Sequence, residues 1–362
     1  MFSVLLGLTA FSGQTASAQL IRAPLTDGFQ RTSSIDVTVD EMLGPKKPRK
    51  ESEAILGPGY PALWVAEVQY KPMRHRLIPV TDPKTRQIKE ELVWYFIYRI
   101  IPRDYTELAG SKREDLRAKL ENEELKPSND FEENLVQPLI LPRFALRIDD
   151  VANGKTYVDE VNLEIQKAVF DREFGSKAGG LTLLNSITGI QEISEPVSST
   201  DALVDPLENA IYGVAIWRDV DPDTDYFTVF MSGFSNAYRV ERPTADLIVE
   251  QKVIEQRFGR PGDRFRQEES EFRFLDEARL RPNGNLEVTM DGVLSTFVAG
   301  RQAPVFVDQL RNQLENTSNG QTQWPHWLYR QREANLTVPQ LEPILRHAAT
   351  SEASAAKNNP SP

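Results

Sequence analysis

Four aspartates, Asp219, Asp221, Asp223 and Asp225, occupy every second position of one short segment. In an extended loop this spacing aims the carboxylates toward one side, and carboxylate oxygens are ligands that Ca²⁺ prefers. The segment is not an EF-hand, because Thr224 stands where that loop needs glycine and Phe230 where it needs a bidentate glutamate. The spacing suggests a weak calcium site as a hypothesis, and a solvated turn at Asp221-Pro222 is the interpretation we favour.

Other residue types that carry chemistry are scattered. The three histidines, His75, His326 and His347, have no second histidine or acid at a metal-ligand spacing such as H-E-x-x-H. Ser232 and Ser235 lie in no G-x-S-x-G elbow, and no glycine-rich phosphate loop is present. The sequence therefore predicts no catalytic residue and no cofactor apart from possible calcium.

Two tryptophans bracket a proline and a histidine near the C-terminus, at Trp324 and Trp327. Exposed tryptophans stack on sugar rings or peptides, because the ring offers a large apolar face with a polar N–H. The commoner use is packing onto a hydrophobic core, which is the reading we favour here.

The acidic segment joins two apolar runs that we expect to pair as a central β-hairpin. Residues 210–217 are apolar on both faces, and 226–232 alternate between apolar and polar residues. Gly233 then marks a bend. In another strand, 91–101, Trp94 and Phe96 share one face with Tyr98 and Ile100, while Val93, Tyr95 and Ile97 share the other.

Local signals predict further elements. Asn153-Gly154 indicates a hairpin between strands at 139–149 and 155–159. Helical spacing of apolar residues predicts helices over 112–125, 160–170, 304–314 and 339–347. Arg260-Pro261-Gly262-Asp263 has the residue types of a type II turn.

The composition is that of an ordinary soluble globular protein, and the N-terminal residues predict export. It has 362 residues, of which 40% are hydrophobic and 26% charged, with no cysteine and a net charge of −11. Such an acidic charge balance disfavours binding to a nucleic-acid backbone.

Residues 4–11 are an apolar run followed by Ala16-Ser17-Ala18, which predicts a signal peptide over 1–18. No apolar run is long enough to predict a transmembrane segment.

We expect a mainly β protein with two β-sandwich-like (Ig-like) halves and peripheral helices. A disordered arm is predicted at 19–60, an N-terminal β-sandwich-like domain with a helical insert at 61–190, a C-terminal β-rich domain at 208–347, and a disordered tail at 348–362. The boundary between the halves falls in the Gly-, Ser- and Thr-rich residues near 190–208.

Four pieces of the sequence occur together: VWYFIYRI at 93–100, YGVAIW with DVDPDTDYFTVFMSG at 212–233, FGRPGDRF at 258–265, and HWLYR at 326–330. In this set the chain resembles a family of uncharacterised exported bacterial β-rich proteins, over about residues 60 to 330. The pieces are strands and turns, so the resemblance implies a fold and export and brings no activity with it.

These observations predict an exported, periplasmic or extracellular protein that binds or supports an envelope protein or polysaccharide without catalysis. One alternative is an extracytoplasmic hydrolase whose site assembles from distant residues. Another is a calcium-dependent carbohydrate-binding module. A pocket with convergent acids and a histidine would favour the enzyme, and a flat or edge-exposed aromatic face would favour a binding protein.

Overall fold

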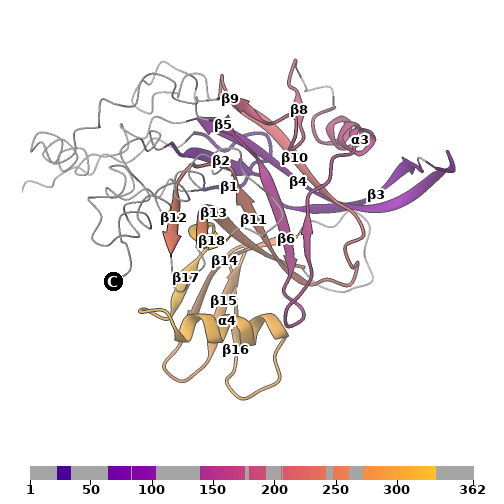
Figure 1. Cartoon of the computed structure of the whole chain (residues 1–362). Helices are drawn as coiled ribbons and strands as arrows, with labels where there is room; N and C mark the ends of the chain where they lie inside the picture. The colour runs from indigo at the N-terminus through magenta and orange to yellow at the C-terminus, as the bar shows by residue number, and fades with distance from the viewer. Residues whose placement is uncertain are drawn as a thin grey trace, which may run out of the picture.

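The computed structural model describes residues 23–33, 64–82, 84–102, 139–175, 179–192, 205, 207–241, 248–260 and 272–331. The predicted signal peptide, the helices predicted at 112–125 and 339–347, the C-terminal tail and most of the turn at 260–263 lie outside the described residues. Within those residues the protein is mainly β, as predicted, and two sheets and two helices make up its layers (Figure 1).

The first sheet is organised around one long strand. β4 (Ile88–Pro102) pairs on one side with β10 (Ile211–Trp217), and β8 (Leu183–Leu184) continues the sheet beyond β10. On its other side β4 pairs with β3 (Arg74–Thr81) and then with β2 (Ala66–Tyr70), which lie one after the other along the strand. β1 (Arg31–Thr32) pairs with β2 and completes the described strands of this sheet.

The second sheet contains ten of the described strands. They are β6 (Arg143–Ile148), β7 (Thr156–Val158), β11 (Tyr226–Ser232), β12 (Tyr238–Glu241), β13 (Ile248–Gly259), β14 (Arg273–Leu280), β15 (Leu286–Met290), β16 (Val293–Phe297), β17 (Gln321–Gln323) and β18 (His326–Gln331). Its main path runs β16-β15-β14-β13-β11-β6-β7, while β12 and β18 pair with β13 and β17 pairs with β14. A separate pair joins β5 (Leu139–Ile140) to β9 (Gln191–Glu192).

The alternation of β4 places the core, as the sequence predicted. Trp94, Phe96 and Tyr98 point between the two sheets, where they meet Phe144, Phe227 and other side chains of the second sheet. Val93, Tyr95 and Ile97 point to the outer face, which α3 (Leu163–Glu173) covers. The sandwich is therefore closed by aromatic packing on one face of β4 and by a helix on the other.

The two helices lie on the outside of the sheets. Asn162 caps α3, its side chain accepting hydrogen bonds from the backbone N–H groups of Glu164 and Ile165. α4 (Val305–Glu315) buries Phe306 and Leu310 against β14 and β15. Both helices were predicted within three residues of their bounds, and the predicted Asn153-Gly154 hairpin is confirmed by the pairing of β6 with β7.

The expected central hairpin is wrong. β10 and β11 do not pair with each other: β10 lies in the first sheet between β4 and β8, and β11 lies in the second sheet between β6 and β13. Residues 218–225 therefore connect the two layers as an arch. Periodicity identified both strands, but strand pairing depends on long-range packing that period alone does not carry.

The predicted division of the chain at 190–208 does not divide the sheets. β10, from beyond that boundary, pairs with β4 from before it, and β6 likewise pairs with β11. Part of the arm predicted to be disordered is ordered too. Phe29 is buried over Arg99, whose guanidinium donates to the backbone oxygen of Pro24, and β1 pairs with β2.

Candidate functional site

The acidic segment forms the arch between the sheets, and its carboxylates contact protein groups. Asp221 accepts a hydrogen bond from the backbone N–H of Asp223 at 2.9 Å. Asp225 lies 3.8 Å from the Arg260 guanidinium, which also donates to the backbone oxygen of Pro222. Asp219 adopts a positive φ of 55° and is exposed. These contacts hold a turn in place.

The structure does not gather the four aspartates into a metal-binding cluster. Across the described residues, which include the whole arch, no three His, Asp or Glu side chains lie together in a way that could hold a metal ion. A loop needs several oxygen ligands on one ion to bind Ca²⁺. Calcium binding at Asp219, Asp221, Asp223 and Asp225 stays a hypothesis.

The tryptophans pack onto the protein. Trp324 is 6% exposed, and its ring N–H donates to Glu255 at 3.1 Å. Trp327 is half-buried against the core between the sheets. The preferred interpretation of Trp324 as a core residue is therefore confirmed. His75 packs on the aromatic rings of Trp94 and Phe272, so its environment is that of a core side chain.

A small recess lies between β3 and α3. It has a volume of about 140 Å³ and opens to solvent. Its apolar surface comes from Ile78 of β3 and Val169 of α3, and Tyr95 of β4 is also exposed to it. Arg76 and Arg172 stand on opposite elements at its rim, and no acidic side chain lines it. We call this recess the arginine pocket.

Strand and helix periodicity together explain how the arginine pocket forms. Along β3, Arg74, Arg76, Ile78 and Val80 share one face because side chains alternate. Ile78 and Val80 are buried beside Ile165 and Val169 of α3. Since Arg172 lies three residues after Val169, it stands on nearly the same side of the helix. The apolar face of β3 packs against the apolar face of α3, and this contact brings Arg76 and Arg172 to one recess with an apolar floor.

A buried ionic group lies beside the arginine pocket and is joined to its lining through Tyr95. Glu173, at the last turn of α3, contacts Lys71 at 3.2 Å and also pairs with Arg74. The hydroxyl of Tyr95 donates to the same carboxylate at 3.0 Å. Burial acts to raise the pKa of Glu173, but the charges of Arg74 and Lys71 outweigh it and hold that pKa below its usual value. Glu173 is therefore ionised, and burial raises the pKa of Tyr95, which stays a hydrogen-bond donor.

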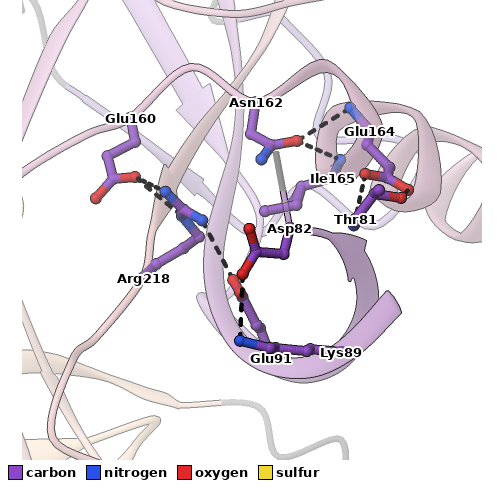
Figure 2. A network of polar contacts seen from close by, with 9 residues as sticks. All are labelled: Thr81, Asp82, Lys89, Glu91, Glu160, Asn162, Glu164, Ile165 and Arg218. Atoms are coloured by element: carbon purple, nitrogen blue, oxygen red, sulfur yellow. Dashed lines mark hydrogen bonds and ion pairs between the residues drawn. The ribbon is translucent and has the colours of Figure 1, made fainter. Parts of the chain in front are cut away.

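A second polar network lies near the first turn of α3. The carboxylate of Glu164 accepts hydrogen bonds from the backbone N–H and the hydroxyl of Thr81, both at 3.0 Å. Nearby, Arg218 donates to Glu160 and Glu91, which ties the arch to the start of α3 and to β4 (Figure 2). β3 and the first part of β4 form a ribbon that extends past α3, and the contact of Glu164 with Thr81 holds this ribbon close to its turn (Figure 1).

The lining of the arginine pocket combines guanidinium groups with apolar side chains. Two arginines at the rim provide planar donors for a carboxylate or phosphate, while the floor provides apolar contact. The volume is below the roughly 300 Å³ at which pockets enclose a whole drug-sized ligand. The arginine pocket therefore has room for one anionic group with a short apolar attachment.

The sequence did not reveal the arginine pocket. Arg76 and Arg172 are far apart in the chain, and each stands in an ordinary amphipathic pattern. One local signal was available: basic residues at two alternate positions, Arg74 and Arg76, in an otherwise apolar-faced strand of an acidic chain.

Compared with protein-family models, with curated proteins and with solved structures, the chain matches none of them. Among the helices of the described ranges, none is both long enough and apolar enough to span a membrane. The case for a function therefore depends on the geometry of the arginine pocket.

Proposed function

We propose that the protein is an exported, non-catalytic binding protein of the bacterial cell envelope, and that the arginine pocket takes one anionic group of an envelope partner. The observation that carries this proposal is that Arg76 of β3 and Arg172 of α3 both line one recess whose other lining residues include Ile78 and Val169.

The surroundings of the arginine pocket support binding without large rearrangement. Glu173 is buried and held by Lys71, Arg74 and Tyr95, so its charge is already compensated inside the protein. The pairing of Glu164 with Thr81 fixes β3 relative to α3. A rigid site loses little conformational entropy when the ligand enters, so even a small pocket gains specificity.

The partner's group combines a carboxylate or phosphate with a small aliphatic body, since Ile78 and Val169 offer only apolar contact. A terminal or side-chain carboxylate on an envelope protein has this chemistry, and so does an acid-substituted polysaccharide. Both present the same anion to the arginines, and both are larger than the pocket, so the remainder of the partner would lie outside it.

Binding is tested with N-acetyl-L-leucine as a probe and N-acetyl-L-leucinamide, which lacks the charge, as its control. Backbone amide shifts of Ala168 and Val169 are followed by NMR during titration. We expect saturable shifts with the acid and none with the amide. Loss of one charge-assisted hydrogen bond costs about 1.5–3 kcal/mol, so Arg76→Gln or Arg172→Gln is expected to weaken binding tenfold or more.

Arg301→Gln is the matched control, because Arg301 is exposed and does not line the arginine pocket. Equal shifts with acid and amide, or equal weakening by Arg301→Gln, would contradict the proposed site. Export is tested separately by N-terminal sequencing of the protein from its native host, where cleavage after Ala18 is expected and an intact Met1 would contradict it.

A further inference from the structure

β16 forms an open edge of the second sheet. Among the described strands it pairs only with β15, and it ends the main path of the sheet. Val293 and Leu294 are 56% and 58% exposed, and Val298, just beyond the strand, is 41% exposed. An open edge carries backbone donors and acceptors that seek another strand.

The hairpin geometry determines which backbone groups of β16 face outward. Asp291 and Gly292 form its two-residue turn, with positive φ values of 44° and 76°. Met290 and Val293 close the turn, so they form a hydrogen-bonded pair, and such pairs recur at every second position. The N–H and C=O groups of Leu294 and Thr296 therefore point away from β15.

From Val293 to Thr296 this edge lacks the features that protect other edges, whereas the Arg311 guanidinium of α4 donates to the backbone oxygens of Phe297 and Val298 at its far end. From Gly292 to Gly300 the chain contains no charged residue and no proline, although charged residues make up 26% of the sequence. By contrast β3, on the edge of the first sheet, carries Arg74, Arg76 and Pro79. Charges and prolines on an edge strand oppose pairing with another chain, and β16 has neither.

The residue pattern around Thr296 is self-complementary. In an antiparallel pair centred on Thr296, Leu294 of the first strand would face Val298 of the second. On the other side of Thr296, Val298 of the first strand would face Leu294 of the second. Asp291 and Arg301 flank the uncharged stretch at its two ends, so antiparallel pairing would bring opposite charges near each other. A twofold interface needs such a match of a surface with itself.

We propose that β16 pairs antiparallel with β16 of a second copy of this chain, with Thr296 facing Thr296 across the twofold axis. The ten described strands of the second sheet would then continue into those of the partner copy. The interface is a single short strand from each copy, so the dimer dissociates readily on dilution.

Charge placed at the axis tests this arrangement. Thr296 is exposed, so Thr296→Lys and Thr296→Glu should fold with the melting temperature of the wild type. In sedimentation velocity over a wide concentration series, we expect the wild type to shift from monomer to dimer. Each variant alone places like charges directly opposite each other and should stay monomeric.

Mixing the two variants is the decisive measurement. Equal amounts of Thr296→Lys and Thr296→Glu chains place opposite charges across the axis, so dimer should return. Gln321→Lys adds the same charge at an exposed position of β17 and should dimerise like the wild type. A wild type that stays monomeric, a Thr296→Lys variant that dimerises normally, or a mixture that stays monomeric would each overturn the proposal.

Discussion

The replacement of Glu173 by glutamine tests the buried ionic group beside the arginine pocket. The Glu173 side chain is 3% exposed and that of Lys71 is 7% exposed. The ammonium of Lys71 also lies 4.7 Å from the centre of the Phe174 ring. Glu173→Gln keeps the shape of the side chain but removes the charge that compensates Lys71.

The expected cost follows from burial. Breaking a buried ion pair by removing one partner costs about 3–5 kcal/mol, because the remaining charge stays in a medium of low polarity. Arg74 is 30% exposed and can be solvated, so the cost comes mainly from Lys71. Because the rings of Phe174 and Phe29 face Lys71 and offset part of this loss, we expect a value near the lower end, about 3 kcal/mol.

Urea unfolding at pH 7 measures this cost. The free energy of unfolding of Glu173→Gln is compared with that of the wild type and of the double variant Lys71→Met/Glu173→Leu. Replacing both charges by apolar side chains of similar volume leaves no buried ion, so the double variant should be close to the wild type in stability. Equal slopes of free energy against urea would show that the denatured states are comparable.

The pH dependence gives a second readout. The folded-state pKa of Glu173 lies below its unfolded value, so the carboxylate stabilises the protein fully above the unfolded pKa of about 4.3. That contribution is lost as the pH falls through the folded pKa. The stability gap between wild type and Glu173→Gln should therefore shrink below about pH 4. A gap under about 1 kcal/mol at pH 7, or a double variant no more stable than Glu173→Gln, would refute the reasoning.

Two further predictions concern the sandwich and the arch. Gly233 has a φ of +84°, and an added Cβ would lie 1.7 Å from the backbone oxygen of Leu141, so Gly233→Ala should destabilise by about 2–5 kcal/mol in urea unfolding. Gly175→Ala, at a positive φ with open space around it, should lose only about 1 kcal/mol. Burial raises the pKa of Asp150 to about 6, above its unfolded value, so its contribution to stability is lost as pH rises from about 4 to about 6. Solvent screening at this half-exposed carboxyl reduces the effect to about 1 kcal/mol, and thermal melts of Asp150→Asn across that range should lack it.

Local signals in the sequence identified local structure. The Asn153-Gly154 turn, the apolar period of α3 and α4, and the two faces of β4 are all determined within a few residues. Each depends on backbone preference or on side-chain alternation, which a sequence displays directly.

The pairing of strands into sheets could not be predicted from such local signals. β10 and β11 are adjacent in sequence and both apolar, which favoured a hairpin, yet they belong to opposite layers. The first sheet needs β10 beside β4 because each carries apolar side chains on both faces, for the core on one side and α3 on the other. The arginine pocket was missed for the same reason, since its residues meet only when α3 crosses β3.

The composition of the arch has a structural explanation that its spacing alone did not suggest. A chain that leaves one sheet for another loses the partners of its backbone N–H groups, and these need acceptors. Asp150 accepts hydrogen bonds from the backbone of Asp225 and Tyr226, and Asp221 accepts one from Asp223. Arg260 then approaches Asp225 from the end of β13. Much of the acidity of this segment thus serves the crossing between layers, which is why an aspartate-rich loop between two strands indicates an inter-sheet arch as readily as a metal site.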